Sequence, residues 1–119
     1  MDDQLPGLIA AVETALVETD HEYAQMPFLV RPLVRRGFVK RTGYDLGAWR
    51  ALLSGARRGE RTRELADALT ALAEHYRGAP ERAKRGMGGG SPEQLALVEQ
   101  RSQARAQAAL ALRVALLAS

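Results

Sequence analysis

The side chains most able to do chemistry in this sequence are arginines in its second quarter. Residues 31–63 contain nine Arg and one Lys against two acids, so this segment carries a net charge of +8. Guanidinium groups form bidentate, charge-assisted hydrogen bonds with phosphate oxygens. The pattern therefore predicts an interface for nucleic-acid phosphates. The residues assigned to it are Arg31, Arg35, Arg36, Lys40, Arg41, Arg57, Arg58, Arg61 and Arg63.

An acidic N-terminal segment offers a competing interpretation of the same cations. Residues 1–30 contain six acids and no Lys or Arg. Glu18, Asp20 and Glu22 fall in the second half of the first expected helix, where negative charge opposes the helix dipole, so we expect these acids to have a partner. The basic segment either binds a polyanion, RNA or DNA, or pairs with an acidic surface of this chain or another, or forms a solvated face.

Catalytic and metal-binding chemistry find little support in the residue types. There is no cysteine, and no serine stands near an evident grouping of His and acid, so neither an enzyme nor a cofactor is predicted. Glu18 and His21 have the i, i+3 spacing of di-iron helical bundles, which makes a small metal-binding bundle a remote alternative. A solvated acidic face accounts better for this pair, so no metal ligand is assigned. His75 falls near the end of an expected helix, where a protonated imidazole would interact favourably with the dipole.

The elements that position these side chains are predicted to be helices. Apolar residues recur at three- and four-residue steps over 5–25, 46–57 and 61–77, which is typical of amphipathic helices. Residues 28–41 are predicted as a further helix, although Pro32 and Gly37 leave an extended arm as the alternative. Asp45 is expected to cap the helix that follows it, and Trp49 is expected to be buried. The chain is therefore expected to be all-α, a small bundle of four to five helices in one domain over residues 1–119.

Glycine dominates the segment before the last helix. Residues 78–80 read Gly-Ala-Pro, which predicts the end of the fourth helix, and four of the five residues 86–90 are glycine. We therefore expect a flexible loop over residues 79–90. Ser91, Pro92 and Gln94 then form a capping-box signature, which predicts a sharp start to a long C-terminal helix.

The end of this C-terminal helix favours a second kind of function. From residue 108 to residue 118 it is apolar on every face except at Arg113, which indicates burial inside the bundle or against another chain. Protein partners or self-association are therefore expected, and the chain is alternatively a protein-interaction or assembly module. The residues assigned to the partner interface are Leu110, Leu112, Val114, Leu116 and Leu117.

The remaining global features bear on location and class. No apolar run approaches the length of roughly 18 residues that spans a bilayer, so no membrane association is expected. The lack of cysteine agrees with a reducing compartment, and the acidic N-terminus is unlike a presequence, so a cytoplasmic location is expected.

The expected architecture has a known parallel. A short, Arg-rich helical bundle is similar, in architecture alone, to small subunits of multi-subunit ribonucleoproteins such as the helical small subunit of CRISPR effector complexes. The first expectation is therefore a non-enzymatic subunit of a nucleoprotein assembly that binds nucleic-acid phosphates through its Arg-rich segment.

Overall fold

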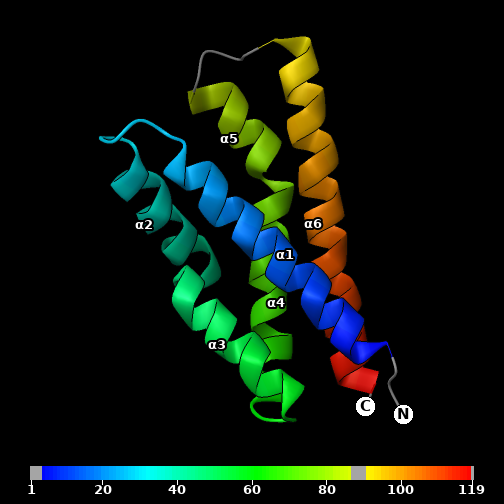
Figure 1. The fold of residues 1–119 in the computed structure, drawn as a ribbon. Coiled ribbons are helices and arrows are strands. Elements are labelled where there is room, and N and C mark those ends of the chain that lie inside the picture. Colours follow the sequence, from blue (N-terminus) through cyan, green and yellow to red (C-terminus); the bar gives the residue numbers. More distant parts are fainter. Residues whose placement is uncertain (1–3, 87–90, 119) are drawn as a thin grey trace.

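The residues described by the computed structural model, 4–86 and 91–118, form six α-helices and no strand. In Figure 1, α4 and α6 run side by side in opposite directions, α1 crosses them, and α2 and α3 lie on the other side of α1 from α6. The prediction of a small all-α bundle with a long C-terminal helix is confirmed. The helices are α1 (Leu5–Ala24), α2 (Arg31–Thr42), α3 (Leu46–Arg57), α4 (Thr62–Arg77), α5 (Ala79–Gly86) and α6 (Pro92–Ala118).

The hydrophobic core is organised around α4. Leu65 and Leu69 of this helix are completely buried and lie one turn apart, so they belong to one apolar stripe. The facing side of α6 contributes the buried Ala106 and Ala109. Such small side chains at a helix contact allow the two backbones to approach closely.

Trp49 of α3 is also completely buried, as the sequence predicted. Its indole N–H donates a hydrogen bond of 3.0 Å to the hydroxyl oxygen of Thr42, at the end of α2. Thr42 is itself buried. A polar N–H inside a core is costly unless it has an acceptor, so this bond allows the indole to sit between α2 and α3 without penalty.

Local sequence signals set three of the helix ends. The side chain of Asp45 accepts a 2.7 Å hydrogen bond from the backbone N–H of Ala48, so it caps α3 as predicted. Ser91 and Gln94 form the predicted capping box, with two reciprocal bonds of 3.1 Å between the backbone N–H of each residue and the side chain of the other. Gly43 ends α2 with a φ of 88°, a left-handed conformation that favours glycine.

The prediction of a loop over residues 79–90 is wrong for its first eight residues, which form α5. Pro80 lies in the first turn of this helix, where its missing N–H breaks no intrahelical bond. Strong helix formers follow, and the ammonium group of Lys84 lies 3.5 Å from the carboxylate of Glu81 one turn earlier. Pro80 therefore begins a helix as well as ending the one before it. Residues 87–90 of the predicted loop lie outside the described residues.

The alternative of an extended arm for residues 28–41 is wrong, because most of this segment is helical. The helix α2 starts at Arg31, three residues later than predicted, after a turn in which Val30 N–H donates to the carbonyl of Pro27 at 2.9 Å. Pro32 is tolerated because it lies in the first turn. Gly37 is accommodated inside the helix.

The longest helix is α6, with 27 residues, and charged residues interrupt its apolar stretches. Within the part of the chain that the structure describes, no helix is both long enough and apolar enough to cross a membrane.

Candidate nucleic-acid interface

The nine cations predicted to bind phosphates fall into two groups in the fold. Five of them lie on α2, and the other four lie at the end of α3 and the start of α4, in the connection between them. The whole length of α3 separates the two groups. Twelve residues at 1.5 Å each place them about 18 Å apart along that helix. The structure therefore does not bring the nine residues together into one cluster.

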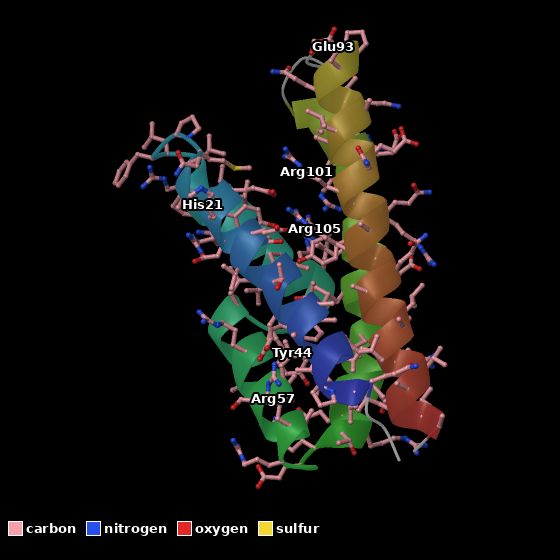
Figure 2. The ribbon with its side chains drawn as sticks, turned by 45° about the vertical axis from the view of Figure 1, so that its right-hand side comes forward. His21, Tyr44, Arg57, Glu93, Arg101 and Arg105 are labelled. Carbon is pink, nitrogen blue, oxygen red and sulfur yellow. The ribbon has the colours of Figure 1, made fainter. Side chains whose placement is uncertain are left out.

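Carboxylates neutralise most of the group at the α3–α4 connection. Arg57, which Figure 2 shows at the end of α3, pairs with Glu13 of α1. Arg58 lies 3.1 Å from the carboxylate of Glu60. Exposed pairs of this kind stabilise a fold by about 0–1 kcal/mol, but they cancel local charge. This group therefore offers an approaching polyanion less positive charge than its sequence indicates.

Arg61 of the same group is likewise paired. Its Nη2 lies 2.7 Å from a carboxylate oxygen of Glu64, which also accepts a 3.0 Å hydrogen bond from the hydroxyl of Tyr44. These two donors, Arg61 first, hold the pKa of Glu64 below its usual value. Arg63 is exposed and forms no ion pair with a described residue.

The acidic helix α1 satisfies part of the basic segment, as the competing interpretation proposed. Arg35 of α2 lies 2.7 Å from the carboxylate of Asp20, and its guanidinium carbon lies 5.9 Å from the centre of the Tyr23 ring. Together with the pair between Arg57 and Glu13, this gives two ion pairs between the basic segment and α1. Among the described residues, Arg35 and Arg57 are the two members of the basic segment that pair with acids of α1.

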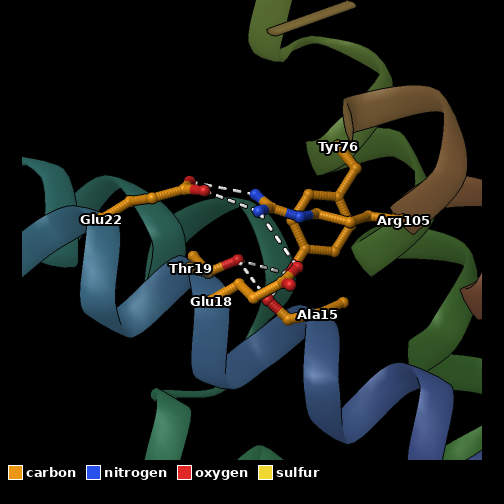
Figure 3. A network of polar contacts seen from close by, with 6 residues as sticks. All are labelled: Ala15, Glu18, Thr19, Glu22, Tyr76 and Arg105. Atoms are coloured by element: carbon orange, nitrogen blue, oxygen red, sulfur yellow. Dashed lines mark hydrogen bonds and ion pairs between the residues drawn. The ribbon is translucent and has the colours of Figure 1, made fainter. Parts of the chain in front are cut away.

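The other two acids near the end of α1 are held by a residue that the sequence analysis did not single out. Arg105 lies on the side of α6 that faces α1 (Figure 2), and Figure 3 shows its guanidinium against two carboxylates. Its nitrogens lie 3.0 and 2.6 Å from the two carboxylate oxygens of Glu22 and 3.3 Å from Glu18. The expectation that these acids have a cationic partner is therefore correct, but the partner comes from α6.

A buried hydrogen-bond network extends from this contact into the core (Figure 3). The guanidinium of Arg105 lies over the ring of Tyr76, at 5.9 Å from its centre. The Tyr76 hydroxyl lies 2.8 Å from Thr19 Oγ1, which donates a 2.7 Å bond to the carbonyl of Ala15. Burial raises the pKa of Tyr76 to about 12. The network is a structural link between α1, α4 and α6.

Four of the five cations on α2 have no carboxylate partner among the described residues. Arg31 donates from Nε to the carbonyl oxygen of Met26 at 2.8 Å, and Arg41 donates from Nε to Nδ1 of His75 at 3.1 Å. Arg36 and Lys40 are exposed, lie one turn apart, and make neither an ion pair nor a side-chain hydrogen bond with a described residue. We call Arg31, Arg36, Lys40 and Arg41 the unpaired α2 cations. Arg36 and Lys40 share one side of the helix, whereas Arg31 and Arg41 lie on other sides of it.

His75 lies in a site that the sequence analysis missed. It is buried, at 4% exposure, and the guanidinium of Arg82 from α5 donates a 2.7 Å bond to its carbonyl oxygen. Burial first, and then the charges of Arg82 and Arg41, lower the pKa of His75 to about 3. The expectation of a protonated imidazole that stabilises the helix dipole is therefore wrong, because the ring is neutral at ordinary pH.

The partner interface predicted on the C-terminal helix is only partly available at the surface. Leu112 and Leu116 are buried in the core, so their assignment to a partner surface is wrong. Each turns inward because it lies on the face of α6 that packs against the bundle. Leu110 is partly buried against the core. Val114 and Leu117 remain exposed.

Among the described residues, the two most exposed large apolar side chains lie in the connection between α1 and α2, and a further exposed leucine follows in the first turn of α2. Phe28 is 78% exposed, Leu29 is 81% exposed and Leu33 is 62% exposed. Leu33 lies on α2 like Phe38, but only Phe38 is buried. We call Phe28, Leu29 and Leu33 the apolar tip.

The remote metal-binding alternative gains no support from the geometry. Glu18 binds Arg105, and the side chain of His21 is exposed on α1 (Figure 2). Among residues 4–86 and 91–118, no group of three or more His, Cys, Asp or Glu side chains is placed to hold a metal ion.

Comparison with known proteins identifies no relative. No protein-family model matches the chain, and no curated protein sequence or solved structure shows significant similarity to it.

Proposed function

We propose that this chain is a non-enzymatic helical subunit of a nucleoprotein assembly and that it binds nucleic-acid phosphates through the unpaired α2 cations, with Arg36 and Lys40 as the exposed pair on one side of the helix. The observation that supports this most directly is the charge of α2. The helix contains five cations and no acid, and Arg35 is the only one of the five in an ion pair with a described residue. A helix with four uncompensated cations attracts a polyanion, and its guanidinium groups match the geometry of phosphate oxygens.

The salt dependence of binding tests this proposal. Labelled single-stranded RNA, single-stranded DNA and duplex DNA are titrated by fluorescence polarisation at several salt concentrations. We expect the double variant Arg36→Gln/Lys40→Gln to bind single strands about tenfold more weakly at low salt. Each lost phosphate contact also lowers the log–log salt slope by about 0.7.

The matched control removes the same charge from the neutralised group. The double variant Arg58→Gln/Arg61→Gln is expected to bind within about twofold of the wild type, since both arginines are already paired with carboxylates. An equal loss in the two double variants contradicts the proposal, because net charge alone would then explain binding. No binding to any probe at low salt also contradicts it.

A second candidate function is an assembly module that associates head to tail. Two exposed apolar clusters support it: the apolar tip, and Val114 with Leu117 near the end of α6. Figure 1 shows these segments at opposite ends of the molecule. A contact between the two clusters on successive copies is heterologous, so it propagates instead of closing into a dimer.

Sedimentation velocity over a wide range of protein concentration tests this second candidate. We expect the wild type to associate with increasing concentration, and both Phe28→Ser/Leu29→Ser and Val114→Ser/Leu117→Ser to remain monomeric. The control is Val17→Ser, which changes an exposed apolar residue of α1 outside both clusters. A wild type that stays monomeric throughout rules out this module.

A further inference from the structure

We infer that Arg41 of α2 and Arg82 of α5 form a binding site for a single phosphate-type oxyanion, next to His75 of α4. This inference goes beyond the proposed function, because one phosphate group is enough to occupy the site and because it assigns a role to Arg82. The proposed function and this anion site share Arg41, so the experiments are chosen to distinguish failure of one from failure of the other.

The two guanidinium groups converge on one imidazole nitrogen. Arg41 Nε lies 3.1 Å from Nδ1 of His75, and Arg82 Nη2 lies 3.4 Å from the same atom. Arg82 Nη2 is also held by the carbonyl oxygen of His75 at 2.7 Å. The imidazole is neutral, so it positions both guanidinium groups and adds no positive charge to them. Residues from three helices therefore place two cations side by side.

Neither of these two arginines has a carboxylate partner. Arg35, Arg57 and Arg105, which also join different helices, each contact an acid. Arg41 and Arg82 form no ion pair with a described residue. Burial first, and then the nearby charge of Arg41, lower the pKa of Arg82. A bound anion would remove this repulsion between the two cations.

Two glycines provide the space that the guanidinium groups occupy. A Cβ atom at Gly37 would lie 3.1 Å from both terminal nitrogens of Arg41. A Cβ atom at Gly78 would lie 2.8 Å from Nη1 of Arg82. Glycine inside a helix is unfavourable relative to alanine, and Gly37 lies in the middle of α2. The positions of both glycines are explained by the two arginines folding back over them.

A third donor lies close to the pair. Tyr23 is buried, and its hydroxyl makes no hydrogen bond with a described residue. Burial raises the pKa of this hydroxyl, while Arg41 and Arg82 are close enough to lower it. Glu22 raises the same pKa, but its carboxylate is already held by Arg105. The hydroxyl therefore has no described acceptor, and its pKa responds to the charge of the two arginines.

The number and arrangement of these donors favour a tetrahedral oxyanion. Each guanidinium presents several N–H groups in a planar fork, which matches two oxygens of a phosphate group. A phosphate group has enough oxygens to accept from both forks at once. Arg41 is exposed and Arg82 is partly buried, so the site is open to solvent on one side. Free phosphate and the terminal phosphate of a nucleic-acid strand share this chemistry.

Isothermal titration calorimetry with three probes tests the site and distinguishes free phosphate from the terminal phosphate of a strand. The probes are inorganic phosphate, a dinucleotide with a 5′-phosphate, and the same dinucleotide without it. We expect saturable binding of the wild type to phosphate, to the 5′-phosphorylated dinucleotide, or to both, and none to the third probe. Arg82→Gln is expected to weaken this binding by at least about tenfold. The matched control Arg85→Gln, which removes the same charge from exposed α5 surface, is expected to stay within twofold.

A second variant keeps the test valid if Arg82→Gln folds poorly. In Gly37→Ala the helix gains stability, so the melting temperature is expected to rise by about 2 to 6 °C. The new methyl group displaces the end of the flexible Arg41 side chain, so phosphate binding is expected to fall several-fold. A purely structural site would not lose affinity while gaining stability.

Three results would overturn the inference. They are the absence of saturable binding to both phosphate probes, equal losses in Arg82→Gln and Arg85→Gln, and unchanged binding in Gly37→Ala. Failure of the proposed function is distinguishable from failure of this site, because Arg36→Gln/Lys40→Gln changes neither Arg41 nor Arg82. Loss of strand binding in that variant with retained phosphate binding supports both proposals.

Discussion

Replacement of Leu112 by alanine is expected to lower the free energy of unfolding by about 3 kcal/mol. Leu112 is completely buried and belongs to the same core cluster as Leu69 and Trp49. Truncation removes the burial of three carbon atoms and leaves a cavity that the packed helices fill only in part. Urea unfolding followed by circular dichroism measures the loss.

The matched variant is Val114→Ala, two residues further along α6. Val114 is 64% exposed, so the free energy of unfolding is expected to change by less than about 0.5 kcal/mol. The two residues were assigned together to a partner interface, and the structure places them on opposite sides of the helix surface. Small and equal effects of both replacements would contradict the burial of Leu112. They would restore the interpretation of the whole apolar end as a docking surface.

The helix ends show what local chemistry makes predictable. The caps at Asp45 and Ser91, and the left-handed Gly43, depend on hydrogen bonds or backbone angles within a few residues. The two caps were therefore predictable from the sequence. The start of α5 was missed although Pro80 was noticed, since proline both ends a helix and occupies the first turn of the next. A dense run of glycines immediately downstream made the loop the more obvious interpretation.

The candidate site was less predictable, because charge totals do not reveal partners. The pair between Arg57 and Glu13 joins residues 44 positions apart, and the bond between Arg105 and Glu22 spans 83 positions. The sequence indicated that the cations of the basic segment can pair with the acids of the first helix, but it did not show which of them do. Because α6 packs against α1, Glu22 pairs with Arg105, an arginine outside the basic segment. Four of the five cations of α2 are left without a carboxylate partner among the described residues, and only Arg35 pairs with an acid of α1.

The phosphate-type site lay outside sequence reasoning for the same reason. Arg41, His75 and Arg82 come from three helices, and none of them has a distinctive neighbour in sequence. The one available signal was Gly37, a glycine inside an otherwise helical basic segment. Its conformational cost called for an explanation, and the structure supplies one in the guanidinium that lies over it.

The stability of the protein is expected to fall as the pH is lowered from about 6.5 toward 3, and His75 is expected to cause much of the fall. The pKa of this imidazole is 6.5 when unperturbed and about 3 in the fold. Between these values the unfolded chain binds a proton that the folded chain does not bind. Stability contributed by the neutral ring is therefore complete above the unfolded pKa and is lost as the pH falls below it.

The expected size of this effect follows from the two pKa values. Between pH 7 and about pH 4.5 the free energy of unfolding is expected to drop by about 2.5 kcal/mol through His75. The groups that face the ring explain why protonation is unfavourable. They are the guanidinium groups of Arg41 and Arg82 and the rings of Phe38 and Tyr76, and none is acidic.

Urea unfolding at the two pH values, in buffer without phosphate, compares the wild type with His75→Gln and His21→Gln. His21 is exposed and lies on α1, so its replacement is expected to leave the pH dependence unchanged. Glu64, whose pKa is lowered, also loses a favourable interaction in acid, but it does so equally in all three proteins. The informative quantity is therefore the difference between the variants. If His75→Gln loses as much stability in acid as the wild type, protonation of His75 does not cause the loss, and this prediction is contradicted.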